Sequence, residues 1–255
     1  MKNLQSKVIL ELTLKMKLIF GIESTQALEV NRKEDYSPVT EIDLFVSNLI
    51  KSELLKIDKY KNYHFFSEED YGELLYPAAI LDPIDGTREL VNGIPECAVS
   101  LGLMNSTSLL DPENFGWIFN PFTGFSIDSS LPSLRPKFVL KKKILGMVSR
   151  SEYEKGYFDK FITNESAVEI TPRGSIAFKL GLLAAGGCDF VLSLSPKNIW
   201  DIAAGTILCQ KRDIFLYQNG QIITDLTNVR IDGVLIWAPA GLAEDLWKKF
   251  KKEKN

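Results

Sequence analysis

A short apolar run that ends in two acids constrains the fold of this chain more than any other segment. Residues 78–81 follow a proline and have the length and composition of a buried strand. Asp82 and Asp85 come next, in a turn stiffened by the proline between them, and Gly86 then leads to Thr87, the expected cap of a helix. Carboxylates attract divalent cations, and the amides of a helix N-terminus attract phosphate. The segment therefore suggests phosphate chemistry on metal ions, but Asp, Pro and Gly are also ordinary turn residues.

Three further acids stand at the ends of predicted elements. Thr40 and Asp43 have the spacing of a capping arrangement at the start of an amphipathic helix. Glu68 opens a run of three acids behind the aromatic strand 63–66, and Asp201 stands at the start of a helix over 202–210 that is rich in small residues suited to close packing. Read alone, each is an ordinary helix-start or solvated acid. Because neighbouring strands often follow each other in sequence, the acidic ends of strands 63–66 and 78–81 are expected to converge.

The composition restricts the class of protein. The chain has 255 residues, of which 45% are hydrophobic, so it can bury a large core as one domain or as two packed halves. A net charge of −3 gives no basic field for a nucleic acid polymer, and no apolar run reaches the length of a membrane span. The three cysteines form no CxxC pattern, which is typical of reduced thiols in a cytoplasmic protein. Nucleophilic catalysis with histidine would depend on His64 alone.

The order of predicted elements indicates a layered α/β protein. A helix over 3–20 and a strand over 98–104 belong to the first half, and a hairpin turns at 120–124. The proline-containing segment 129–137 is the expected boundary, which divides the chain into 1–135 and 136–255, packed as one compact unit. In the second half the predicted strands alternate with helices, and the sequence then ends in a hairpin, a strand and a last helix. The alternating elements are strands 144–149, 167–170 and 189–194, and helices 152–162, 175–185 and 202–210.

Taken together, these segments resemble the inositol monophosphatase superfamily of magnesium-dependent, commonly lithium-sensitive phosphatases. The matching segments are Ser37-Pro38-Val39-Thr40-Glu41-Ile42-Asp43, Ser67-Glu68-Glu69-Asp70, Asp82-Pro83-Ile84-Asp85-Gly86-Thr87, Gly174-Ser175 and Trp200-Asp201-Ile202-Ala203-Ala204-Gly205. Each is weak alone, but their order and spacing are specific. The resemblance implies the αβαβα sandwich shared with fructose-1,6-bisphosphatase, with most metal ligands in 1–135 and with Asp201 and substrate contacts in 136–255.

The resemblance also implies a role for each matching residue. Glu68, Asp82 and the Ile84 carbonyl would bind one Mg²⁺, and Asp82, Asp85 and Asp201 a second. Glu68 would reach a weaker third ion through water. Thr87, paired with Asp43, would orient the attacking water. The residues expected to contact the substrate are Asp85, Gly86, Thr87, Gly174, Ser175 and Asp201, with the amides of Gly86 and Thr87 on phosphate.

The chemistry of Mg²⁺ is consistent with these roles. Mg²⁺ prefers hard oxygen ligands and retains waters, which suits a carboxylate-rich site. The four acidic ligands would repel one another without the ions, so a metal-free form should have loose packing or elevated pKa values. The partner is a small phosphorylated substrate. Since the family includes dimers and monomers, the sequence allows either a monomer or a homodimer.

Two other functions compete with this interpretation. A haloacid dehalogenase-like phosphatase also carries acids after a strand, but in a D-x-D-G-T motif. The spacing D-x-x-D-G-T found here alters the relative directions of the two side chains. A non-catalytic metal or nucleotide sensor would not need the Asp43–Thr87 pair.

The motifs are most similar to those of bacterial 3′(2′),5′-bisphosphate nucleotidases, which remove the 3′-phosphate of 3′-phosphoadenosine 5′-phosphate. Inositol monophosphatases usually carry a glutamate shortly before the Trp-Asp pair, where this chain has Ser193 or Leu194. Residues 174–187 do not closely match the nucleotidase pattern either. We therefore place the nucleotide first, inositol monophosphate second and a sugar bisphosphate third.

Overall fold

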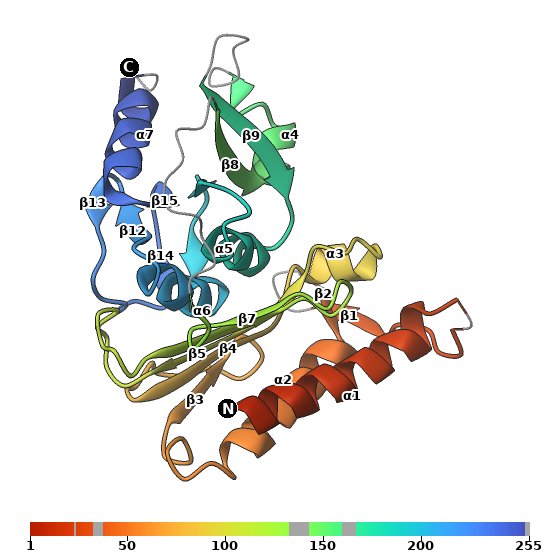
Figure 1. The fold of residues 1–255 in the computed structure, drawn as a ribbon. Coiled ribbons are helices and arrows are strands. Elements are labelled where there is room, and N and C mark those ends of the chain that lie inside the picture. The colour runs from red at the N-terminus through yellow and green to blue at the C-terminus, as the bar shows by residue number, and fades with distance from the viewer. Residues whose placement is uncertain (23, 33–37, 133–142, 160–166, 253–255) are drawn as a thin grey trace.

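The computed structural model describes residues 1–22, 24–32, 38–132, 143–159 and 167–252, and all structural statements below refer to these ranges (Figure 1). Two mixed β-sheets form the frame of the molecule, with helices between and outside them. The proposed boundary segment 129–137 lies partly outside the described residues, so the division at residue 135 stays a prediction.

The first sheet has the strand order β3-β4-β5-β6-β7. Only the β3–β4 pair is parallel, and each later pair is antiparallel. Its strands are β3 (His64–Ser67), β4 (Ala78–Asp85), β5 (Ala98–Met104), β6 (Phe115–Phe119) and β7 (Ser126–Asp128). The other elements of this part are α1 (Lys2–Phe20), β1 (Val30–Arg32), β2 (Pro38–Thr40), α2 (Glu41–Leu54) and α3 (Thr87–Val91).

The second sheet has the order β13-β12-β15-β10-β8-β9, with parallel pairing only around β8. Its strands are β8 (Ile144–Ser149), β9 (Val168–Arg173), β10 (Phe190–Ser193), β12 (Phe215–Gln218), β13 (Gln221–Ile222) and β15 (Leu235–Ala238). The remaining elements are α4 (Arg150–Glu154), α5 (Ile176–Ala184), β11 (Lys197–Asn198), α6 (Ile199–Gln210), β14 (Arg230–Ile231) and α7 (Ala240–Lys252).

Five layers stack in the expected αβαβα order, and three apolar clusters hold them together, one of which extends over both sides of the middle helical layer. In β4, Ala79 and Leu81 pack toward α1 and α2, whereas Ala78 and Ile80 pack toward α5 and α6 on the other face. The same alternation in β10 directs Val191 toward α5 and α6, and its neighbours toward α4 and α7. Helices α5 and α6 are therefore buried between the two sheets (Figure 1).

Small residues allow α6 to lie unusually close to its neighbours, as the run Ala203-Ala204-Gly205 predicted. A Cβ on Gly116 of β6 would lie 2.4 Å from the Ala204 carbonyl oxygen, and a Cβ on Gly205 would lie 2.5 Å from the Leu180 Cβ of α5. The N-terminus of α6 is therefore fixed against the first sheet.

Several predicted element boundaries were wrong; the strand predicted over 167–170, for example, continues to Arg173. The strand predicted over 78–81 continues to Asp85, because the β4–β5 ladder resumes after a bulge. The helix predicted over 152–162 ends at Glu154: Gly156 adopts a left-handed φ of 72°, which terminates helices, and residues 160–162 lie outside the described ranges. Helix α6 begins at Ile199, three positions earlier than predicted. None of the helices that the structure describes has the length and hydropathy to cross a membrane.

Candidate functional site

Three carboxylates from two elements meet between the sheets. One oxygen each of Asp82, Asp85 and Asp201 lies within 4.8 Å of the others. On a regular strand, residues three positions apart point to opposite faces, so Asp82 and Asp85 should diverge. The bulge between Asp82 and Asp85 shifts this alternation by one and directs both side chains toward α6. The spacing D-x-x-D therefore converges because the strand is irregular.

Asp82 is the most buried of the three acids, with 1% of its surface exposed. Its Oδ1 is buried and accepts no hydrogen bond from any residue that the structure describes. Burial raises the pKa of Asp82 well above its ordinary value, and the charges of Glu68, Asp85, Asp201 and Asp43 raise it further. A buried carboxylate oxygen without a partner is costly, and a bound cation would satisfy it.

Asp201 lies in the first turn of α6. Its Oδ2 accepts a hydrogen bond of 2.9 Å from the backbone amide of Asn198, the residue that caps the helix. Burial raises the pKa of Asp201 to about 8, and the negative charge of Asp85 is the next contribution. The elevated pKa expected for a metal-free site is thus present at Asp82 and Asp201.

Asp43 and Thr87 lie next to each other, as expected for the water-orienting pair. The Thr87 hydroxyl is 3.0 Å from the Ile84 carbonyl oxygen and 3.4 Å from Asp43 Oδ1. Asp43 Oδ2 accepts hydrogen bonds from the Thr40 amide and hydroxyl, at 2.8 and 2.6 Å, which form the predicted cap of α2. Burial raises the pKa of Asp43 to about 6, although the Thr40 hydrogen bonds oppose the shift.

The expected capping role of Thr87 was wrong. Gly86 is the N-cap of α3, with φ of 91°, and Thr87 is the first residue of the helix. A Cβ on Gly86 would lie 3.0 Å from the Glu96 carbonyl oxygen and 3.2 Å from Ser175 Cβ, so a side chain is strained there both by φ and by crowding. The hydroxyl of Thr87, the first residue of α3, does not cap the helix and instead faces Asp43 and the Ile84 carbonyl.

The N-terminus of α5 holds Asp85. Its Oδ2 accepts hydrogen bonds of 2.6 Å from both the Ser175 hydroxyl and the Ala177 amide. Ser175 is also the N-cap of α5, where its oxygen accepts the Phe178 amide at 3.0 Å. The predicted substrate contacts Gly174 and Ser175 thus lie beside Asp85.

Glu68 is placed differently from the three central aspartates. Its amide donates to the Leu81 carbonyl at 3.0 Å, so the ends of β3 and β4 do converge as predicted. Its charge raises the pKa of Asp82, Asp43 and Asp201. Among the described residues, however, the Glu68 carboxylate is not part of the group whose oxygens lie within 4.8 Å of one another, which consists of Asp82, Asp85 and Asp201.

A cleft of about 280 Å³ opens beside these acids and contains side chains that the sequence motifs did not predict. Lys179 is 3% exposed and donates to the Arg173 and Gly174 carbonyls at 3.0 and 3.2 Å, and burial lowers its pKa to about 8. A lysine inside an apolar helix was a visible signal, because lysine is rarely buried without partners. The cationic residues that line the cleft are Arg88, Arg150, Arg173, Lys179 and Lys197.

Comparison with known protein families agrees with the site geometry. The model of the inositol monophosphatase family matches residues 2–211. This chain belongs to the inositol monophosphatase family. Its curated relatives include inositol monophosphatases and bisphosphate nucleotidases.

Two curated relatives illustrate the two kinds. Inositol monophosphatase 2 of Saccharomyces cerevisiae is 26% identical over 201 residues, which cover 68% of this chain and 66% of the yeast protein. The 3′(2′),5′-bisphosphate nucleotidase CysQ of Aggregatibacter actinomycetemcomitans is 26% identical over 219 residues, 79% of this chain and 77% of that protein. Among solved structures, an IMPase of Thermotoga maritima superposes with a TM-score of 0.72 over 100% of both chains at 19% identity, which confirms the fold.

The residues of this inositol monophosphatase family member fit a hard divalent cation. Its donor set consists of carboxylate oxygens, the ligands that Mg²⁺ prefers. The buried Oδ1 of Asp82 lacks a hydrogen-bond donor among the described residues and has two further carboxylates beside it. Asp82, Asp85 and Asp201 are therefore the residues that would hold such an ion.

Proposed function

We propose that this chain is a Mg²⁺-dependent phosphomonoesterase that acts on a small phosphorylated metabolite. The observation that carries the proposal is the convergence of three aspartates around the buried, unpartnered Oδ1 of Asp82. Two or three ions are proposed: one at Glu68, Asp82 and the Ile84 carbonyl, a second at Asp82, Asp85 and Asp201, and a weaker third near Glu68. Mg²⁺ in such a site lowers the pKa of water and neutralises charge on the leaving oxygen.

The protein's own groups would orient the reactants. Thr87 lies between Asp43 and the Ile84 carbonyl, so its hydroxyl can accept from an attacking water while it donates to Asp43. Asp43 is the proposed acceptor of the proton, because its buried carboxylate is already connected to that hydroxyl. The amides of Gly86 and Thr87, at the start of α3, are proposed to bind the phosphate oxygens.

We propose 3′-phosphoadenosine 5′-phosphate as the substrate, which is converted to AMP and phosphate. When cations neutralise Asp85 and Asp201, the charged lining that remains has five basic side chains against Glu89 and Glu154, and two of the five, Arg150 and Arg173, also pair with Glu96. A second anionic group on the substrate would be attracted to that lining. Neither Ser193 nor Leu194 offers a carboxylate for a sugar ring: the Ser193 hydroxyl donates to the Ser195 carbonyl, and the Leu194 amide donates to Glu152.

Inositol monophosphate is the second candidate, and sequence similarity supports it as strongly as the nucleotide. The yeast inositol monophosphatase and the bacterial nucleotidase are both 26% identical to this chain. A sugar bisphosphate is the third candidate, since it also carries two anionic groups.

The deciding experiment measures phosphate release from 3′-phosphoadenosine 5′-phosphate, inositol 1-phosphate and fructose 1,6-bisphosphate, with Mg²⁺ and with added Li⁺. We expect the highest kcat/KM on the nucleotide and inhibition by Li⁺. A higher kcat/KM on inositol 1-phosphate would overturn the substrate proposal only. Absence of phosphate release from all three substrates would favour a non-catalytic sensor.

A further inference from the structure

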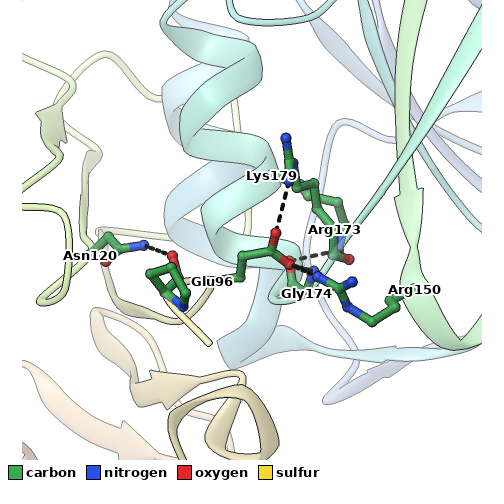
Figure 2. Close-up of polar contacts among 7 residues, drawn as sticks. Glu96, Asn120, Arg150, Arg173, Gly174 and Lys179 are labelled. Atoms are coloured by element: carbon green, nitrogen blue, oxygen red, sulfur yellow. Dashed lines mark hydrogen bonds and ion pairs between the residues drawn. The ribbon is translucent and has the colours of Figure 1, made fainter. Parts of the chain in front are cut away.

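Glu96, in the loop between α3 and β5, is a buried carboxylate outside the group of acids that would hold metal. It is 8% exposed and receives hydrogen bonds from three donors on distant segments (Figure 2). The Arg150 guanidinium donates to Oε2, Arg173 Nη1 lies 2.9 Å from Oε1, and the Gly174 amide lies 2.7 Å from Oε2. Burial alone would raise the pKa of Glu96, but these hydrogen bonds hold it below the ordinary value.

The segment Arg173–Gly174 is held from its other side by Lys179. The ammonium donates to the carbonyl oxygens of both residues, at 3.0 and 3.2 Å (Figure 2). The Gly174 amide thus points to a carboxylate, and the two carbonyls point to a buried cation. The Gly174 amide and the two carbonyls each have a partner of complementary charge, which fixes the orientation of this peptide.

The orientation of this peptide determines where the next residues lie. Ser175 has a φ of 46°, an uncommon conformation for a residue with a side chain, so surrounding contacts must hold it. From that position the Ser175 hydroxyl and the Ala177 amide both donate to Asp85 Oδ2 at 2.6 Å. Glu96 is thus connected to Asp85 through one short stretch of backbone.

We propose that Glu96 is a positioning residue for the metal centre, which acts by fixing Gly174 and so the two donors that orient Asp85. The proposal rests on the proposed function in one respect, namely that Asp85 is a ligand of the cation. The simpler alternative is that Glu96 only stabilises the fold through its two arginines. The two roles differ in whether loss of Glu96 changes the hydrogen bond at Asp85.

Glu53 of α2 provides a matched control for the stabilising role. Its carboxylate is also paired with two cations, Lys7 at 2.7 Å and Lys56 at 2.6 Å. Its side chain is 13% exposed, against 10% for Glu96. Glu53 does not line the cleft beside Asp85. Removal of its side chain therefore shows what the loss of comparable ion pairs does when the contacts of Asp85 are left intact.

The experiment compares the wild type with Glu96→Ala, Glu96→Gln and Glu53→Ala in two measurements on the full chain. Amide hydrogen exchange of Ala177, without metal, reports the contact with Asp85. Titration with Mn²⁺ alone, without substrate, reports the affinity of the site. For Glu96→Ala we expect faster exchange at Ala177 and a loss of Mn²⁺ affinity of about 10- to 100-fold, the range for residues that orient metal ligands.

Glu96→Gln keeps an acceptor for the Gly174 amide but loses the charge, so its exchange and affinity should lie between those of the wild type and Glu96→Ala. Glu53→Ala should match the wild type in both measurements. Unchanged Ala177 exchange and Mn²⁺ affinity in both Glu96 variants would overturn the positioning role. If Ala177 exchange accelerates as expected but the wild type binds no Mn²⁺, Glu96 still fixes the donors to Asp85, but the metal centre and with it the proposed function fail.

Discussion

The carboxylate of Asp43 uses its two oxygens for different partners. Oδ2 accepts from the Thr40 amide and hydroxyl and so completes the cap of α2, whereas Oδ1 faces the Thr87 hydroxyl. Asp201 caps α6 in the same way, with Oδ2 on the Asn198 amide. A helix-start acid and a site residue are therefore compatible roles. The cap orients the carboxylate, and the helix dipole favours its charge.

At the residue scale, we predict that Thr87→Ala lowers kcat by about 100-fold, the lower range for loss of a group that assists proton transfer. The dependence of activity on Mg²⁺ concentration should stay unchanged, because the aspartates converge without the Thr87 hydroxyl. Steady-state kinetics on the preferred substrate measures both quantities. Thr87→Ser, which keeps the hydroxyl, is the control and should retain most activity.

Two outcomes would contradict this role of Thr87. The first is a Thr87→Ala enzyme with wild-type kcat. The second is an acyl-phosphate trapped by rapid quench, which would indicate an aspartate nucleophile of the haloacid dehalogenase type.

At the element scale, the position of α6 against the first sheet depends on glycine. In Gly116→Ala the new Cβ would lie 2.4 Å from the Ala204 carbonyl oxygen, so α6 must move. We expect the free energy of unfolding to fall by about 1–3 kcal/mol, the usual cost of overpacking. Mn²⁺ affinity should fall as well, because Asp201 moves with α6. Urea denaturation and Mn²⁺ titration measure the two effects.

Gly72→Ala is the control for this substitution, since its Cβ would have no atom within 4 Å and its φ is ordinary. It should change neither stability nor affinity by a measurable amount. Equal unfolding free energies for Gly116→Ala and the wild type would show that α6 is not confined by β6.

The elements differ in how far the sequence could predict them. The cap of α2 was predictable, because Thr40 and Asp43 are three positions apart and form their contacts locally. The early end of α4 also had a local signal in Gly156. The bulge in β4 had none: its pairing partner β5 is a separate strand, and Asp82 and Asp85 on a regular strand would have pointed to opposite faces.

The role of Glu96 could not be predicted from local sequence either. It lies in a loop without a motif, and its three donors are 54, 77 and 78 positions further along the chain. The motifs identified the acids that would bind metal, because these stand at the ends of elements. They did not identify the residues that hold those acids in place, because these are brought together only by packing of the two sheets.

At the scale of the whole molecule, the raised pKa values of the acids predict how stability depends on pH. Asp43 and Asp201 titrate near 3.8 when unfolded and at about 6 and about 8 when folded, so the folded protein binds more protons between these values. Without metal, these two groups should therefore make stability fall as the pH rises from about 4 to about 8. Thermal unfolding of metal-free protein measures this, and added Mg²⁺ should raise the Tm most at the higher pH.

Other shifted groups do not reverse this trend. The pKa values of Glu96 and Asp128 are lowered, so these acids titrate below the window. Burial lowers the pKa of Lys179 to about 8, so this group makes stability rise with pH, but only above about pH 8. Asp82→Asn, which removes one of the crowded acids, should show a shallower decline than the wild type. A metal-free Tm that rises between about pH 5 and about pH 8 would contradict the prediction.

The burial of α6 between the sheets has a consequence for synthesis of the chain on the ribosome. A nascent chain that ends before α6 already contains Asp82 and Asp85, but only α5 is available to cover the apolar face of its first sheet, with Ile80 and Ile118. Arrival of α6 completes the cover of that face and delivers Asp201 in one step. Protection from aggregation and competence to bind metal are therefore acquired together, late in translation.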